Sequence, residues 1–149
     1  MDLDIMKFSE KEKLAEDPNT PEDILRELAK DKDEDWWVRA YVASNPNTPD
    51  DVLRALAKDK EWAVRGLVAS NPNTFEDTLL YLATDINNGV RVNVAKNPKA
   101  SSKLLIMQFE YEKSLRKPSE FVIRALYVNP KLPAFAKRVI ETLFGEMLP

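Results

Sequence analysis

The stretch SNPNTPDDVLRALAKDK, residues 44–60, nearly repeats an earlier stretch, EDPNTPEDILRELAKDK, residues 16–32, with five of the seventeen positions changed. A third version, SNPNTFEDTLLYLATDI, follows at 70–86. The period is marked by a proline that recurs with spacings of 28, 26, 26 and 32 residues, at Pro18, Pro46, Pro72, Pro98 and Pro130. Such a period indicates stacked units, none of which can bury its apolar face alone.

The segment after each proline turn predicts a helix. Leu25, Leu28 and Ala29 are spaced i, i+3, i+4, which gives one apolar face, and the next two copies keep this pattern. Thr20 is a natural N-cap, Pro21 suits the first helical position, and the two carboxylates that follow favour the positive end of the helix dipole. We therefore interpret the carboxylate pairs as capping groups and not as general acid/base pairs.

The segment before each proline turn has Val38 and Val42 at helical spacing, and it is repeated in later units. With about eight residues between turns, it predicts a short α-helix or a 3-10 helix. We expect an all-α solenoid of about five two-helix repeats, each with a longer and a shorter helix. The whole chain, 1–149, is then one domain, with units at roughly 8–31, 36–59, 62–85, 88–114 and 121–148.

The motifs Val-Arg, Val-Ala, Asn-Pro-Asn-Thr-Pro and Leu-x-x-Leu-Ala-x-Asp together resemble the leucine-rich repeat variant family, which is HEAT-like in style. The likeness covers most of residues 8–114 and is strongest in the first three proline units. It implies alternating α and 3-10 helices in a right-handed superhelix, and a binding scaffold that carries out no reaction. The founding member of the family is associated with a cysteine-rich cluster domain, but this chain has no cysteine, so that cofactor does not carry over.

The composition argues against catalysis. The 149 residues include no cysteine, no histidine and three glycines. Disulfides and thiolate metal sites are therefore excluded, and the usual nucleophile–base pairs and a Gly-rich phosphate loop are missing. We expect no enzyme activity, no catalytic residues, no metal and no cofactor.

The chain reads as a cytoplasmic protein that does not enter a membrane, because no apolar run approaches about 20 residues and the acidic N-terminal stretch lacks a signal peptide's apolar region. Its net charge of -3 is unevenly distributed. Residues 1–35 hold 6 Lys+Arg against 13 Asp+Glu, whereas residues 86–149 hold 11 against 5. Such a field can steer an acidic partner towards the C-terminal half.

An arginine recurs in each unit, and acidic residues precede it. Asp59 and Asp85 lie six residues before their arginines, and Asp31 lies eight residues before Arg39, which resembles the Asp/Arg ladder of HEAT repeats. Because arginine forks pair well with carboxylates, we predict a structural ladder that stops where Tyr111 replaces the aspartate. Its members are Asp31, Arg39, Asp59, Arg65, Asp85, Arg91 and Arg124. The alternative is that these arginines bind phosphate or an acidic peptide.

An aromatic column predicts packing between units or, alternatively, a platform for stacked bases. Its members are Phe8, Trp36, Trp62 and Phe121. The apolar line near the C-terminus predicts a helix with one side packed on the array. This line comprises Phe135, Val139, Leu143 and Met147, with Ile140 and Phe144 beside it.

Two outer columns change character along the chain, from charged residues in early units to apolar ones in later units. Arg26 and Arg54 give way to Leu80 and Ile106, and the neighbouring column ends in Tyr81 and Met107. Trp37 also appears out of column, and the insertion between Pro98 and Pro130 carries Arg116 and Lys117. The hypothetical partner-binding residues are Trp37, Leu80, Tyr81, Ile106, Met107, Arg116 and Lys117. One alternative is that the fourth unit is irregular and its insertion covers the apolar positions. A separate alternative is that the insertion loop is a simple spacer and does not bind.

These features favour a non-catalytic protein–protein interaction scaffold. The partner would be a protein or peptide with an apolar segment and acidic residues, and the acidic N-terminal end of another copy is one candidate, by self-association. The alternative is a nucleic-acid-binding HEAT-like array of the DNA-repair type. The net charge of -3 argues against that alternative, because such binding draws most of its affinity from phosphate neutralisation.

Overall fold

The computed structural model describes residues 5–30 and 36–149. In these two ranges the chain is helical and contains no strand, which confirms the all-α class. The elements are α1 Phe8–Glu16, α2 Glu22–Leu28, α3 Trp37–Ser44, α4 Asp50–Leu56, α5 Trp62–Ser70, α6 Glu76–Leu82, α7 Asn88–Lys96, α8 Ser102–Ser114, α9 Glu120–Val128, α10 Ala134–Phe144 and the 3-10 helix η2 Gly145–Met147.

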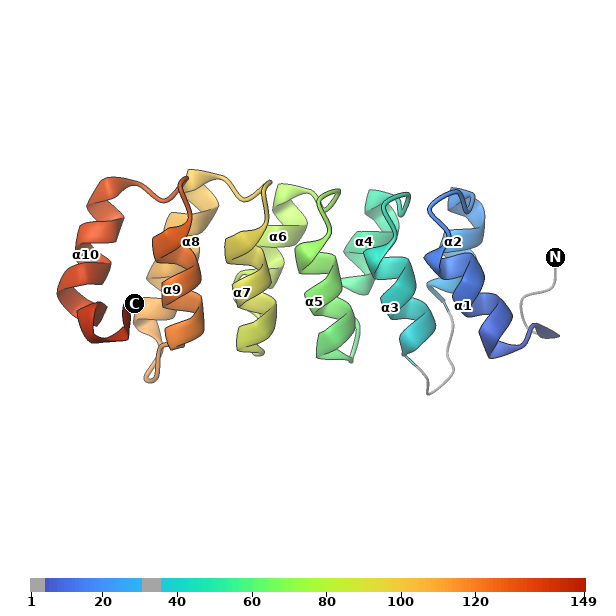
Figure 1. The fold of residues 1–149 in the computed structure, drawn as a ribbon, viewed down its shortest axis with the longest axis horizontal. Helices are drawn as coiled ribbons and strands as arrows, with labels where there is room; N and C mark the ends of the chain where they lie inside the picture. Colours follow the sequence, from blue (N-terminus) through green and yellow to red (C-terminus); the bar gives the residue numbers. More distant parts are fainter. Residues whose placement is uncertain (1–4, 31–35) are drawn as a thin grey trace.

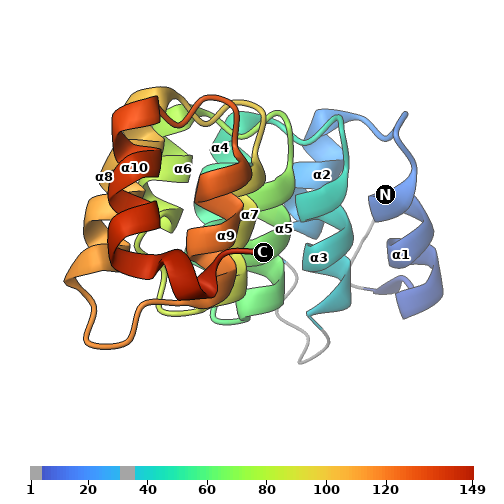
Figure 2. The same cartoon turned by 60° about the vertical axis from the view of Figure 1, so that its left-hand side comes forward.

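The helices form two parallel rows that follow the order of the chain (Figure 1). The odd-numbered helices form one row, in which each contacts the next, and the even-numbered helices form the other. The turned view shows the same two layers, with α8 beside α10 at one end (Figure 2). Each unit thus adds one helix to each row, as expected for a solenoid.

The relative helix lengths differ from the expectation in the first three units. The helices after the proline turns, α2, α4 and α6, have seven residues each, whereas α3 and α5 have eight and nine and are α-helical, not 3-10. Helices α4 and α6 are short because the aspartate that follows each of them, Asp59 or Asp85, belongs to the next turn. The Asp59 carboxylate, for example, accepts a hydrogen bond from the backbone N–H of Glu61.

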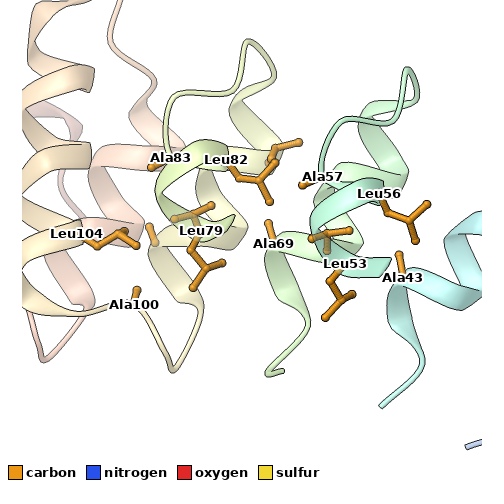
Figure 3. Packing of buried hydrophobic residues seen from close by; sticks show 14 of the residues in the cluster. Ala43, Leu53, Leu56, Ala57, Ala69, Leu79, Leu82, Ala83, Ala100 and Leu104 are labelled. Carbon is orange, nitrogen blue, oxygen red and sulfur yellow. The ribbon is translucent and has the colours of Figure 1, made fainter. Parts of the chain in front are cut away.

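The core lies between the two rows and is continuous from Ala15 to Ile140. Leu53 and Leu56 of α4 and Leu79 and Leu82 of α6 are 0–3 % exposed and point towards the odd row (Figure 3). Fully burying one such leucine contributes about 1.5–3 kcal/mol. The apolar columns of the repeat therefore supply the main stabilisation of every unit.

The C-terminal helix packs on the array through one side, as predicted. Ile140 and Ala136 are buried, and the ring of Phe144 meets Phe109 of α8 edge to face, with 6.4 Å between centroids. Phe135, Val139 and Leu143 are largely exposed, at 61, 37 and 54 %. The side that packs is therefore the one that carries Ile140 and Phe144, beside the apolar line.

The threonines before α2, α4 and α6 do not cap these helices. Thr74 Oγ1 donates a hydrogen bond to the Val68 carbonyl at 2.6 Å, and Thr20 and Thr48 make the same contact with Leu14 and Val42. The last carbonyls of a helix have no intrahelical partner, and these ones lie at the buried end of the odd helix. The hydroxyl is therefore used to close the preceding helix rather than to start the next one.

The asparagine before each proline joins successive turns. Asn71 Nδ2 donates to the carbonyls of Ala43 and Asn45 in the preceding unit, at 2.8 and 3.2 Å, while its Oδ1 accepts from the backbone N–H of Asn73. The same bridge recurs at Asn45, Asn97 and, with one carbonyl, Asn129. Each amide thus serves as donor to one turn and acceptor in its own.

Aspartate occupies this position in the first unit. Asp17 Oδ1 accepts from the Asn19 N–H at 2.8 Å, as the asparagines do, but it has no amide to donate. No earlier turn stands before it in residues 5–30, so the acceptor half of the bridge is sufficient.

We predict that Asn71→Asp lowers the free energy of unfolding by at least about 2 kcal/mol, because two buried carbonyls lose their donor and face a carboxylate. Urea unfolding followed by circular dichroism measures the change. Asp17→Asn is the matched control and should be nearly neutral. Equal loss in both variants would show that the bridge between turns is not the cause.

Candidate functional site

The arginine column connects the two rows through buried ion pairs. Arg65 on α5 donates from Nε and Nη2 to the Asp85 carboxylate at 2.6 and 2.9 Å. Its Nη1 donates to the backbone carbonyl of Asp59 at 2.9 Å. Both side chains are largely buried, with 13 and 7 % exposed. This is a bidentate fork, the geometry in which arginine binds carboxylate best.

The register of these pairs differs from the predicted one. Arg39, Arg65 and Arg91 each pair with a carboxylate about 20 residues later. The aspartates before Arg65 and Arg91 contribute their backbone carbonyls. Arg39 pairs with Asp59 at 2.6 Å and Arg91 with Glu112 at 2.9 Å. The difference arises because the next unit packs against the guanidinium. Asp31, predicted as a member, lies outside the described residues.

The ladder does not stop at Tyr111, and that prediction is wrong. The insertion lengthens α8 to thirteen residues, which brings Glu112, 21 residues after Arg91, into the carboxylate position. Glu112 is completely buried, and Tyr111 instead lies under the Arg91 guanidinium, 5.9 Å from its carbon to the ring centroid. In the sequence, the signal for Glu112 was a carboxylate one residue after the expected aspartate position, within a helix that the insertion lengthens.

Arg124 ends the column without a buried carboxylate. Its Nε donates to the backbone carbonyl of Met147 in η2, and its Nη2 forms a half-exposed ion pair with Glu120. Arg65 and Arg91 have their guanidinium groups engaged by protein acceptors, and so does Arg39. These three arginines are therefore not available as a phosphate-binding column.

The environment of Asp85 shifts its titration. Burial raises the pKa of the carboxyl, whereas hydrogen bonds from Arg65 and from the Asn87 N–H lower it, and the net pKa is below the ordinary value of 3.8. The same pair raises the pKa of Arg65 above its ordinary value. The folded state therefore favours the charged pair.

A second set of ion pairs lies on the outer surface, between successive even helices. Arg26 on α2 contacts Asp51 of α4 at 3.0 Å, and Arg54 on α4 contacts Asp77 of α6 at 3.3 Å. These arginines also pair with acidic residues on their own helices. Leu80 of α6 and Lys103 of α8 occupy the equivalent positions in the next step, so the charged pairing ends there.

The predicted apolar residues lie on this surface. Tyr81 on α6 and Met107 on α8 are 55 and 51 % exposed, while Leu80 and Ile106 beside them are half-buried against the core. We call these four residues the outer patch. The insertion lengthens α8 and leaves both Tyr81 and Met107 exposed, so the alternative in which it covers them is wrong.

The other predicted partner residues lie elsewhere. Arg116 and Lys117 are exposed in the turn after α8. Trp37 is 50 % exposed in the first turn of α3, in the odd row, and stacks on Trp36 with 3.9 Å between centroids. The structure therefore does not bring Trp37 into the outer patch.

The aromatic column is more exposed than packing between units requires. Phe8, Trp62 and Phe121 are 40, 55 and 67 % exposed. Trp62 still lies beside Gly89 of the next odd helix, so part of its ring packs between units.

Sequence reasoning missed a small hollow beside the outer patch. It lies between α4 and α6, has a volume of about 130 Å³, and is lined by Arg54, Ala57, Lys58, Asp77, Thr78 and Tyr81. The buried Thr78 hydroxyl has no hydrogen-bond partner, although Val52 and Leu104 fill the same place in neighbouring units. A polar residue in an apolar column was its signal in the sequence.

Stacked two-helix units joined by buried ladders define a helical-repeat protein. The family model described as Leucine rich repeat variant matches residues 36–61, which comprise α3, α4 and the following turn, and it confirms the resemblance over this unit. The comparison with curated proteins gave no match, and neither did the comparison with solved structures.

None of the helices in residues 5–30 and 36–149 is long and apolar enough to cross a membrane. The same ranges contain no group of three or more Asp or Glu side chains that could hold a metal ion.

We predict that Arg65→Ala lowers the free energy of unfolding by about 1–3 kcal/mol, because Asp85 is left buried without its partner. Arg54→Ala, which breaks only exposed ion pairs, is the control and should cost about 0–1 kcal/mol. Chemical denaturation of both variants gives the comparison. Similar values for the two would mean that the Arg65 pair does not stabilise the fold more than a surface pair.

The lowered pKa of Asp85 predicts a contribution to acid sensitivity. A carboxyl with a folded pKa below its unfolded value stabilises the protein above the ordinary pKa of 3.8, and this contribution is lost as the pH falls through the folded pKa. Asp85→Asn cannot take up that proton. Thermal unfolding measured from about pH 5 downwards should therefore show a shallower loss of stability in this variant than in the wild type. Parallel pH profiles would contradict the assignment.

Proposed function

We propose that this chain is a non-catalytic protein–protein interaction scaffold that binds its partner on the outer patch. The observation that carries the proposal is the change along the outer surface. Between α2 and α4, and between α4 and α6, that surface is closed by ion pairs. From α6 onwards this pairing ends, because Leu80 and Lys103 occupy the equivalent positions and the apolar Ile106 and Met107 follow on α8. Nothing in the stacking of the units requires the change.

The chemistry of the outer patch is typical of interfaces. Tyrosine and methionine are enriched in the buried centres of interfaces, and each can lose about half of its surface to a partner here. Leu80 and Ile106 are partly buried against the core, so their exposed parts form a fixed apolar surface on which a partner can pack. Arg116 and Lys117, exposed in the turn after α8, add positive charge to this part of the chain, which favours a partner with acidic residues.

Nucleic-acid binding remains the second candidate, but the geometry gives it less support. Three of the ladder arginines are engaged by protein carboxylates. The net charge of -3 also opposes phosphate binding. Fluorescence anisotropy with a 20-base-pair duplex separates the two candidates, because tight retention at physiological salt would favour the nucleic-acid role.

We predict that Tyr81→Ala combined with Met107→Glu weakens partner binding by at least about tenfold while the melting temperature stays nearly unchanged, because both side chains are half exposed. The partner is first identified by affinity capture with the wild type and then titrated in purified form by calorimetry.

Phe75→Ala is the matched control, since Phe75 is 51 % exposed at the start of α6, on the turn side, and should leave affinity unchanged. Full affinity in the double variant would overturn the assignment of the outer patch. Unfolding of the double variant would show that these residues serve the core.

A further inference from the structure

The C-terminal helix carries an apolar stripe that has no partner in the described residues. Phe135, Val139 and Leu143 are spaced i, i+4, i+8, which places them along one side of α10, and they are 61, 37 and 54 % exposed. We call this set the α10 stripe. Its ends are eight residues apart, or about 12 Å along the helix, which corresponds to roughly two helical turns.

The stripe faces outward and not towards a following unit. Phe135 and Val139 occupy the positions that Asp77 and Tyr81 have in α6. Asp77 and Tyr81 line the hollow shared with the preceding helix α4, and both stay exposed although later units pack after α6. One more repeat stacked on the end would therefore leave Phe135 and Val139 uncovered.

The stripe continues the outer patch. α8 lies beside α10 in both views, and the Phe109–Phe144 ring contact joins the two helices (Figures 1 and 2). In earlier units Arg26 faces Asp51 and Arg54 faces Asp77 across successive even helices. The equivalent positions at the end of the array are Ile106 of α8 and Phe135 of α10, so we expect these two to face each other. Half-exposed apolar side chains thus follow one another from α6 to α10.

The charges around this surface are basic and uncompensated. Of the carboxylates nearby, Glu110, Glu112 and Glu120 form ion pairs and Glu141 accepts a hydrogen bond from Tyr127, whereas Glu146 in η2 is exposed. Around this surface, Lys103, Arg116, Lys117 and Arg138 form no ion pair with a carboxylate of the described residues. A partner with acidic groups beside its apolar face would complement these charges.

We infer that α8 and α10 together bind an acidic amphipathic helix of another protein, whose apolar face covers the α10 stripe. The inference rests on the proposed scaffold function and names the chemistry of its partner. A helix fits because its apolar residues recur with the same spacing as the stripe, which is the groove-binding mode of amphipathic helices.

A second copy of the chain fits less well. Two α10 helices packed on each other through the stripe would bring their Arg138 side chains together. The N-terminal helix of another copy is acidic, but of α1 only Phe8, at 40 % exposure, offers a large exposed apolar side chain. One side chain cannot cover a three-residue stripe.

The test uses two labelled peptides, acetyl-EELLEELLKELLEE-amide and the same sequence with Glu and Lys exchanged. By fluorescence anisotropy the wild type should bind the acidic peptide at least about tenfold more tightly than the basic one. Phe135→Ser combined with Val139→Ser should lower that affinity by at least about tenfold, whereas Phe75→Ser, the matched control, should not. Amide chemical shifts of the wild type should change on α8 and α10.

Equal affinity for the two peptides would overturn the inference, as would full affinity in the double variant or shifts confined to other helices. The shift map uses the wild type, so it decides the question even if the double variant unfolds. Sedimentation of the free protein tests for a second copy, because a self-association that the double variant abolishes would make the copy the occupant. If the peptides fail to bind but the captured partner depends on Tyr81 and Met107, the scaffold function stands and only this inference fails.

Discussion

The side-chain amide before each proline turn sets the spacing of the whole array. Asn71 must donate to carbonyls of the preceding turn and also accept from its own turn, so the position needs a short side chain with both a donor and an acceptor. Because the amide is buried, water does not compete for these bonds, and an unfilled carbonyl would be costly. Asp17 is the exception. It has no preceding turn to donate to in the described residues, so an acceptor alone, which bonds the Asn19 N–H, is sufficient there.

At the opposite end of the odd helices, the bidentate arginine–carboxylate pairs also join neighbouring units. On α5, Arg65 near the start is held by the turn after α6, and Asn71 after the last residue is held by the preceding turn. Such a helix is therefore bonded to the following unit near its N-terminal end and to the preceding unit at its C-terminal end. Buried ion pairs often add little net stability compared with apolar packing, but they penalise any register that separates the partners. We infer that the forks serve mainly to fix how the rows align.

The sequence alone was sufficient to predict the repeat, the all-α class and which polar residues recur between the core positions. These features depend on the spacing of residues within one unit. Which group each polar side chain contacts depends instead on how successive units stack, and the wrong predictions concern these contacts. Thr20 satisfies the usual N-cap preference but bonds to the previous helix, and Arg65 pairs with the following turn instead of the preceding one. Glu112 was missed because a lengthened helix changes which residue reaches the arginine.

The outer surface can vary because the fold does not depend on it. Exposed ion pairs such as Arg26–Asp51 contribute about 0–1 kcal/mol, far less than the buried columns and bridges. Moreover, the pair changes as a unit. Where leucine replaces arginine at Leu80, lysine replaces aspartate at Lys103, so no carboxylate is left without its partner. Losing both partners at once costs the array little, and the inner ladder continues beneath this surface through the Arg91–Glu112 pair.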